Sequence, residues 1–266
     1  MKQNLYKSQM GVKAYIKPII PIMLCALMIY SSCRKDSVTS PSNQPTSNEA
    51  LSGQIAVNLA KSLAGTYGGV NLNDGVDSIT VADHNGPQHA CSCSHNNPLC
   101  GFYTDSLVNY NNKIVDTTWH TGGNLKFWFN CVDGKITNYT AYDSLMTTKT
   151  TPQSVSTYRV QQYYTIQSLD SLHHFVGVNG TNDLLTTVTY TGNSKAPETG
   201  GAHYGLTNLD IDVVAKDIKS GTATFQAYGS NWNTSGSITF LGNHMADITM
   251  GGKVYHTNLL TGKSTN

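Results

Sequence analysis

The spacing of apolar residues changes along this chain of 266 residues. Between residues 47 and 69, apolar residues recur at every fourth position, which predicts an amphipathic helix. Ser47 or Asn48 can cap its start, and Gly65 can end it. Because the apolar stripe is narrow, we expect the helix to lie against a sheet edge or to cover one end of a barrel. The stripe consists of Leu51, Ile55, Leu59 and Leu63.

Beyond residue 100 the period shortens to two residues, as in a half-buried β-strand. In residues 124–132, Phe127 and Phe129 share one face, and residues 221–229 alternate in the same way. Further β-rich segments lie at 102–110, 113–120, 135–147, 155–168, 172–178, 184–191, 204–215, 236–241, 245–250 and 253–260. Turn dipeptides separate many of them: Asp133-Gly134, Asn179-Gly180, Gly192-Asn193, Ser220-Gly221, Gly242-Asn243 and Gly251-Gly252.

Short connections between strands force antiparallel neighbours. We therefore expect a mainly β fold, an antiparallel meander of about ten to twelve strands with one N-terminal amphipathic helix. The sheet should form a barrel-like or sandwich arrangement, because long open edges invite aggregation.

The N-terminal residues have the pattern of a secretory signal. Residues 1–17 carry four lysines and no acidic residue, and residues 18–30 are almost entirely apolar. This apolar run is shorter than the roughly 20 residues of a transmembrane helix. Small residues directly before Cys33 suggest a signal peptide of residues 1–32 that is cleaved there, followed by acylation of Cys33. The alternative is an uncleaved anchor or an ordinary signal peptide with a chance cysteine.

The residues around Cys33 also carry a resemblance. "SSC" resembles the lipobox of bacterial lipoproteins, with Tyr30 in place of the usual aliphatic residue, and is similar to the looser form in Bacteroidota. "RKD" at residues 34–36 resembles the Lys-plus-acid signal that sends such lipoproteins to the cell surface. The resemblance implies an outer-membrane location, lipid-anchored and facing the cell exterior, with a periplasm-facing orientation as the alternative. It implies a location and not an activity.

The composition of the chain after residue 32 indicates its domain organisation and argues against nucleic acid as a partner. Residues 33–48 are polar and read as a lipidated, disordered tether, and residues 49–266 as a single helix-plus-β domain. Without residues 1–32 the net charge is −3, and Arg34 and Arg159 are the only arginines. Nucleic acid is therefore not an expected partner, because proteins that bind phosphate backbones concentrate Lys and Arg on one face. The expected partner is the membrane, through the lipid anchor.

Cysteines and histidines are concentrated in residues 83–102. We expect two disulfides, because an exported chain is in an oxidising compartment, and we expect no cofactor. The preferred pairs are Cys93–Cys100 and Cys91–Cys131, because a Cys91–Cys93 bridge would close a strained loop. Free thiols, or a zinc or copper site, are the alternatives. The candidate metal ligands are His84, His89, Cys91, Cys93, His95 and Cys100.

Asp followed by Ser or Thr and then by an apolar residue or Thr occurs more often than composition suggests. The pattern resembles the O-glycosylation sequon of exported Bacteroidota proteins. The alternative is structural, because Asp-Ser starts turns and the apolar residue then opens a strand. The candidate acceptors in the domain are Ser78, Ser106, Thr117, Ser144 and Ser171.

Catalytic motifs are not apparent, and the chain has only two glutamates, so we name no catalytic residue. A binding or structural role in the envelope is favoured, and an enzyme is the less favoured alternative. Tyr228 and Trp232 lie in a segment that reads as an exposed aromatic loop and are candidate ligand contacts. A carbohydrate-binding protein would need them exposed together on one side. A carrier of apolar ligands or lipids would need a closed sheet with an empty interior, lined by Phe127, Phe129 and Phe225.

Overall fold

The computed structural model describes residues 47–74, 100–192 and 195–266. These ranges contain helix α2 (Asn48–Leu63), the 3-10 turn η1 (Leu72–Asp74) and eleven strands. The strands are β1 (Tyr103–Ile114), β2 (Thr117–Val132), β3 (Lys135–Thr150), β4 (Ser154–Ser168), β5 (Phe175–Tyr190), β6 (Glu198–Asp212), β7 (Asp217–Gly229), β8 (Trp232–Gly242), β9 (Met245–Met250), β10 (Lys253–Asn258) and β11 (Ser264–Thr265). The predicted signal peptide, Cys33 and most of the tether lie outside the described residues.

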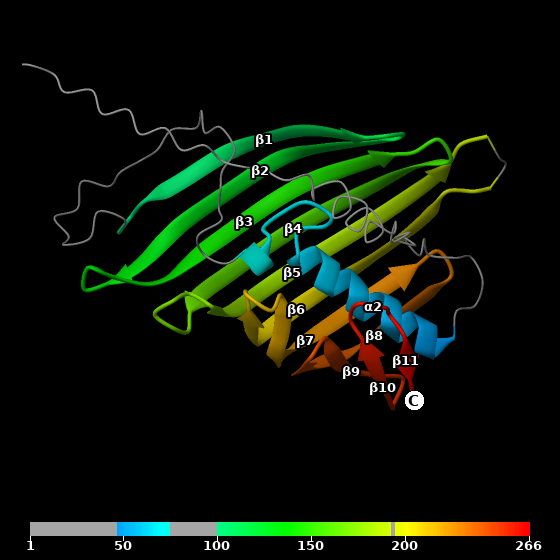
Figure 1. The fold of residues 1–266 in the computed structure, drawn as a ribbon. Coiled ribbons are helices and arrows are strands. Elements are labelled where there is room, and N and C mark those ends of the chain that lie inside the picture. Colours follow the sequence, from blue (N-terminus) through cyan, green and yellow to red (C-terminus); the bar gives the residue numbers. More distant parts are fainter. Residues whose placement is uncertain (1–46, 75–99, 193–194) are drawn as a thin grey trace, which may run out of the picture. The chain divides into compact units, whose positions relative to one another are not determined.

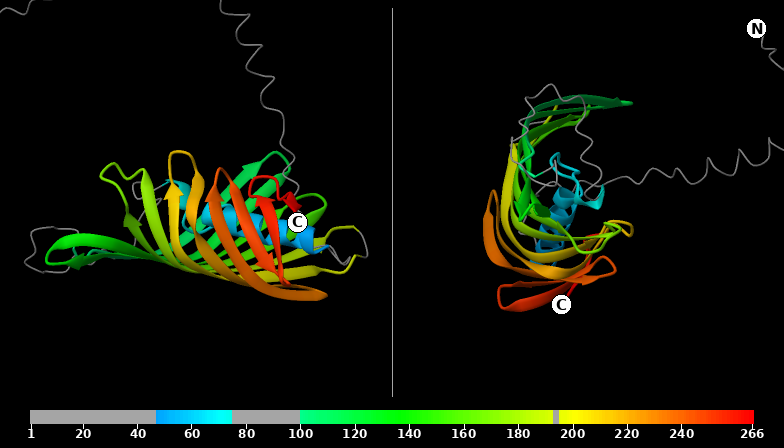
Figure 2. Two further views of the ribbon diagram at one scale, coloured as in Figure 1. Left: turned by 90° about the horizontal axis from the view of Figure 1, so that it is seen from below. Right: turned by 90° about the vertical axis from the view of Figure 1, so that its left-hand side faces the viewer.

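All eleven strands form one sheet in which each strand pairs with its neighbour in sequence (Figure 1). Every pair is antiparallel, from β1 with β2 to β10 with β11. The predicted mainly β meander is confirmed. The sheet curls around helix α2 without closing, since β1 and β11 are not paired with each other (Figure 2).

Helix α2 forms where the four-residue period predicts it. The Ser47 side chain accepts a hydrogen bond from the Ala50 N–H at 3.2 Å, and Gly65 follows the helix with a φ of +67°. The four residues of the stripe are all buried. The helix contacts β9, β10 and β11, but it also reaches β5 and lies within the concave side of the sheet rather than on an edge alone (Figure 2).

Two predicted turns lie inside strands instead. Asn179-Gly180 is part of β5 and Ser220-Gly221 is part of β7. The register shifts next to Gly180, where φ is +145°, and a Cβ on Gly221 would lie 2.4 Å from the Asn208 carbonyl oxygen. These glycines therefore permit bulges and a close backbone approach within long strands. Asp133-Gly134 and Gly251-Gly252 do form turns, as predicted.

The concave face of the sheet and helix α2 share one buried cluster. Tyr164, Tyr204 and Phe225 are almost fully buried beside Leu59 of the helix. The Tyr204 hydroxyl donates to the Ile55 carbonyl oxygen at 2.9 Å, which satisfies its polar end and ties β6 to the helix. Burial of these aromatic rings against the helix holds the sheet in its curved form.

A disulfide joins Cys100, just before β1, to Cys131 near the end of β2, with a Cα–Cα distance of 5.6 Å. The predicted pairs Cys93–Cys100 and Cys91–Cys131 are therefore wrong. The reason is the register of the first hairpin, which places Tyr103 opposite Trp128. Continuing that register three residues outward brings positions 100 and 131 face to face. Cys91 and Cys93 lie outside the described residues.

Candidate functional site

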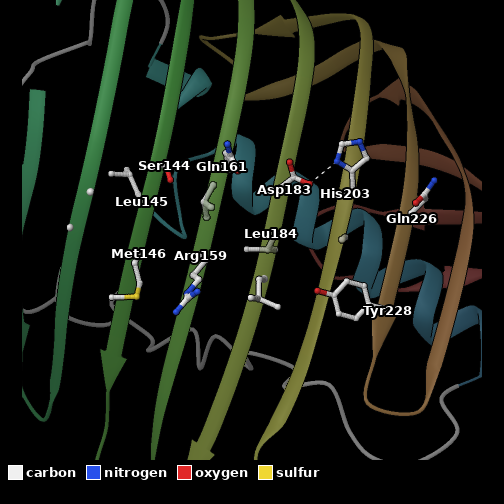
Figure 3. Close-up of a pocket in the computed structure, with 15 residues that line it drawn as sticks. Ser144, Leu145, Met146, Arg159, Gln161, Asp183, Leu184, His203, Gln226 and Tyr228 are labelled. Atoms are coloured by element: carbon white, nitrogen blue, oxygen red, sulfur yellow. Dashed lines mark hydrogen bonds and ion pairs between the residues drawn. The ribbon is translucent and has the colours of Figure 1, made fainter. Parts of the chain in front are cut away.

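The convex face of the sheet, opposite helix α2, carries a hollow of about 600 Å³. Figure 3 shows it from the convex side, with helix α2 behind the strands. We call it the outer-face hollow. Its outward-pointing side chains come from β3 to β7 and consist of Ser144, Met146, Arg159, Gln161, Asp183, Leu185, His203, Gln226 and Tyr228.

Strand register arranges these side chains in two rows across the sheet. Because residues directly opposite each other on antiparallel strands point to the same face, a polar row can be followed from β3 to β7. At each step of this row the two residues are register partners. The polar row consists of Ser144, Gln161, Asp183, His203 and Gln226.

The second row lies two residues away on each strand and contains apolar residues, glycines, Arg159 and Tyr228. Its members from β2 to β7 are Gly122, Met146, Arg159, Leu185, Gly201 and Tyr228. A Cβ on Gly201 would lie 2.7 Å from the Tyr228 hydroxyl oxygen, so the tyrosine covers a position without a side chain. At Gly122 a Cβ would meet no atom closer than 3.6 Å, so the missing side chain there leaves space that helps to form the hollow.

The charged groups of the hollow differ in how they are paired. Asp183 Oδ1 lies 2.6 Å from His203 Nδ1, and both side chains are about half exposed, at 48% and 51%. The row places Gln161 and Gln226 on either side of this pair, so neither direct register neighbour of the pair is a Ser or Thr. The arrangement supplies hydrogen-bond donors and acceptors for a ligand.

A cluster of three aromatic side chains, Tyr103, Trp128 and Tyr163, lies next to the hollow on the same face of the sheet. The Trp128 ring lies 6.3 Å from that of Tyr103 and 6.4 Å from that of Tyr163, and Tyr163 is 47% exposed. Gln161 Nε2 donates to the Tyr142 hydroxyl at 3.1 Å, which links the hollow to this group. Ring faces and planar polar groups are therefore continuous over β1 to β4.

The two candidate ligand contacts lie on opposite faces. Tyr228 is exposed in the outer-face hollow, opposite Asn233 in the β7–β8 hairpin. Trp232 pairs with Gly229, points to the other side and packs partly against the core. The sheet does not bring Tyr228 and Trp232 together, because they occupy alternate positions of the hairpin.

The candidate glycosylation sites have different environments. Ser144 and Ser171 are exposed, Thr117 is half-buried at the start of β2, and Ser106 is buried. Ser78 lies outside the described residues. Turn formation explains the Asp170 pattern, because its carboxylate accepts from the Phe175 and Leu172 N–H groups.

Turn formation does not explain the same pattern at Asp143 and Ser144. Both residues lie in the middle of β3, where Asp143 points into the core and Ser144 points outward into the hollow. The exposed hydroxyl of Ser144 is therefore available on the face of the candidate site.

One of the six candidate ligands of the predicted alternative zinc or copper site, Cys100, is not a free thiol. Cys100 is bonded to Cys131 and cannot act as a thiolate, and the other five candidate ligands lie outside the described residues. In the ranges that the structure describes, no group of three or more His, Cys, Asp or Glu side chains could hold a metal ion.

A buried polar group on the concave face fixes the end of helix α2. Asn182 Nδ2 donates to the Ser62 hydroxyl at 2.9 Å, and Gln162 Nε2 donates to the same residue. Asp143 Oδ2 and Gln162 Oε1 both accept from the Val70 N–H at 2.9 Å. Burial raises the pKa of Asp143 to about 7, against the lowering effect of the Val70 N–H. This group positions the segment after the helix and faces away from the hollow.

Sequence reasoning singled out only Ser144 and Tyr228 among the outward-pointing residues of the hollow, and it missed the other seven: Met146, Arg159, Gln161, Asp183, Leu185, His203 and Gln226. Their strands alternate clearly, but which residues meet across strands depends on register. Register follows from the exact turn and bulge positions, which the sequence pattern does not specify.

Similarity to known proteins does not assign a function to this surface. No protein-family model matches the chain, and neither a curated protein nor a solved structure matches it. A functional proposal therefore depends on the geometry of the outer-face hollow and on the residues of this chain.

Proposed function

We propose that the protein is a lipid-anchored envelope protein that binds carbohydrate in the outer-face hollow. The observation that carries the proposal is the row of five polar side chains beside the exposed Tyr228 ring. Amide, imidazole and carboxylate groups can donate to and accept from sugar hydroxyls. An aromatic ring can contact the apolar face of a sugar.

The proposed location is the outer membrane, with the domain facing the cell exterior. The basic and apolar N-terminal residues, the "SSC" sequence and the polar tether support an anchor at Cys33. Among the described residues, no helix is long and apolar enough to cross a membrane. The lipid anchor is accordingly the proposed membrane attachment.

An apolar-ligand carrier is less well supported. The sheet is open, and Phe127 and Phe225 are buried in the same cluster as helix α2. The side chains proposed to line an empty interior are thus in contact with the core. The row of outward-pointing polar side chains across β3 to β7 also offers hydrogen bonds that a ligand with hydroxyl groups can use and a lipid chain cannot.

The test is oligosaccharide binding by the full chain in detergent, measured by calorimetry after a screen on a glycan array. We expect Tyr228→Ala to weaken binding by about tenfold or more, as for an aromatic anchor. Tyr110→Ala is the matched control, because Tyr110 is also exposed but lies on β1 outside the hollow. Failure of every oligosaccharide to bind, or equal weakening by both substitutions, would contradict the proposal.

A further inference from the structure

We propose that the outer-face hollow selects a carbohydrate that bears a carboxylate group, and that Arg159 binds this group. The inference rests on the proposed carbohydrate site and specifies its ligand class. Arg159 and Arg34 are the only arginines of the chain, and Arg159 lies in the hollow with an exposed side chain. Among the described residues, Arg159 is therefore the one arginine that can offer a guanidinium group to a ligand in the hollow.

The guanidinium group of Arg159 has no partner among the described residues. In the described ranges, Arg159 takes part in no ion pair or hydrogen bond through its side chain. The nearest carboxylate of the hollow belongs to Asp183, which lies in the adjacent row and is paired with His203 at 2.6 Å. An arginine with no protein partner keeps its five donors for a ligand.

The side chains next to Arg159 leave its guanidinium group accessible to a ligand. Its register partners on either side are Met146 and Leu185, both apolar, so no side chain in its own row competes for the guanidinium group. Gln161 lies two residues along β4 on the same face and can add a hydrogen bond to the same ligand group. A charge bounded by apolar side chains is less screened than one surrounded by water.

The charge balance of the hollow favours one anionic group. The ionisable side chains among the described residues that line it are Arg159, Asp183 and His203, of which the last two are hydrogen-bonded to each other. One unpaired guanidinium matches one carboxylate, and its planar fork binds a carboxylate through two parallel hydrogen bonds. A phosphate monoester carries nearly two charges and would need a second cation.

The spacing of the row points to an oligosaccharide rather than a single sugar. Arg159 on β4 and Tyr228 on β7 belong to the same row, three strand spacings apart. Three spacings amount to about 14 Å. A ligand that contacts both residues must extend across β5 and β6, past Leu185 and Gly201. Acidic chains of several sugar units have this length and carry carboxylates at regular intervals.

The test compares matched acidic and neutral ligands. Tetramers and hexamers of galacturonate, mannuronate and the glucuronate-containing repeat of hyaluronan are each used together with the same oligosaccharide after reduction of its carboxyl groups. Binding to the full chain in detergent is measured by calorimetry at low and at physiological salt. We expect at least one acidic oligosaccharide to bind tenfold or more tightly than its reduced form, with a preference that falls as salt rises.

Substitutions assign the preference to one side chain. Arg159→Gln should abolish it, and Arg159→Lys should retain only part of it, because lysine keeps the charge without the fork. Lys113→Gln is the matched control, since it removes one exposed positive charge from β1, outside the hollow. Thermal unfolding checks that each variant is folded, which is expected because both side chains are exposed.

The outcomes separate this inference from the proposed function. Equal binding of acidic and reduced forms, with sensitivity to Tyr228→Ala retained, would overturn the carboxylate inference and keep the carbohydrate site. A preference for a sulfated oligosaccharide, or one that survives Arg159→Gln, would also overturn it. Binding of no oligosaccharide of either kind would overturn both.

Discussion

Asp143 holds the segment after helix α2 by a hydrogen bond, but burial of its carboxylate is energetically unfavourable. Its carboxylate lies fully buried on the concave face, where Oδ2 accepts from the Val70 N–H at 2.9 Å. Its other oxygen, Oδ1, has no hydrogen-bond partner among the described residues. Because burial disfavours the charged form, the pKa of Asp143 is raised to about 7, and a fraction of the molecules hold it protonated near neutral pH.

Asp143→Asn should therefore make the protein more stable at high pH relative to wild type. When the pKa of a carboxyl is raised on folding, the folded protein loses stability as the pH rises from the unfolded-state pKa to the folded-state pKa. For Asp143 these two pKa values are 3.8 and about 7. The stability difference between the Asp143→Asn variant and wild type should grow by up to about 4 kcal/mol between about pH 4 and pH 8, since roughly three pKa units correspond to that energy. Urea unfolding at several pH values measures it.

The control for Asp143 is Asp133→Asn. Asp133 is exposed in the β2–β3 turn with a φ of +51°, a conformation that asparagine also tolerates. This substitution should leave the pH dependence of unfolding unchanged. A pH dependence that is the same in wild type and in Asp143→Asn would show that Asp143 ionises normally in the folded protein.

Helix α2 is shaped by its partner as much as by its own propensity. Gly53 lies inside the helix, where glycine is unfavourable by about 1 kcal/mol relative to alanine. A Cβ at this position would lie 2.0 Å from the Gly262 carbonyl oxygen, in the segment between β10 and β11. The glycine is explained by this close approach of the C-terminal segment to the helix.

Gly53→Ala should destabilise the protein, although it improves the intrinsic propensity of the helix. Overpacking of a closely packed site typically costs about 1–3 kcal/mol, more than the gain in propensity. Gln54→Ala, at a half-buried neighbouring position of the same helix, should change stability much less. Thermal and urea unfolding decide the sign, and a stabilised Gly53→Ala protein would show that the helix and the C-terminal segment are not in contact.

Much of the fold at this scale could be predicted from the sequence. The four-residue period located helix α2, and its apolar stripe is buried as expected. The two-residue period located the strands, but segments predicted as separate strands are joined in β2 and in β5. The reason is that glycine serves bulges as well as turns, and the residue pattern at Gly180 is the same for both.

The candidate site was less predictable than the fold. Tyr228 could be identified as an exposed aromatic residue, whereas Arg159 and His203 are 44 positions apart and meet only through the register of three strands. The disulfide pairing was wrong for the same reason, because the partner of Cys131 is set by the first hairpin. Periodicity gives the face of a residue, but it does not give its neighbour on the next strand.

The whole sheet depends on its C-terminal end. Strand β10 is covered on its far edge by the short β11, and helix α2 contacts β9, β10 and β11. Leu259 is buried in the main core between β10 and β11. These last residues thus protect an edge of the sheet and complete the contact with the helix.

Deletion of residues 259–266 should lower the free energy of unfolding by at least about 2 kcal/mol, because a buried leucine is lost. The uncovered edge of β10 should also cause concentration-dependent association. Unfolding curves and light scattering measure the two effects, and a chain without Asn266 alone is the control. A truncated protein that stays monomeric and equally stable would show that β11 has no protective role.

The meander has a consequence for the order of folding. Each strand pairs with the one made just before it, so most of the ladder can grow in the order of synthesis, and such local pairing favours rapid folding. Helix α2 precedes all of the described strands in the chain, yet its contacts with β9 to β11 become available only after those three strands have been made. Until then the apolar concave face is incompletely covered and open to aggregation or to chaperones. The synthesis of β9 to β11 therefore sets the earliest time at which the core between the helix and the sheet can be completed.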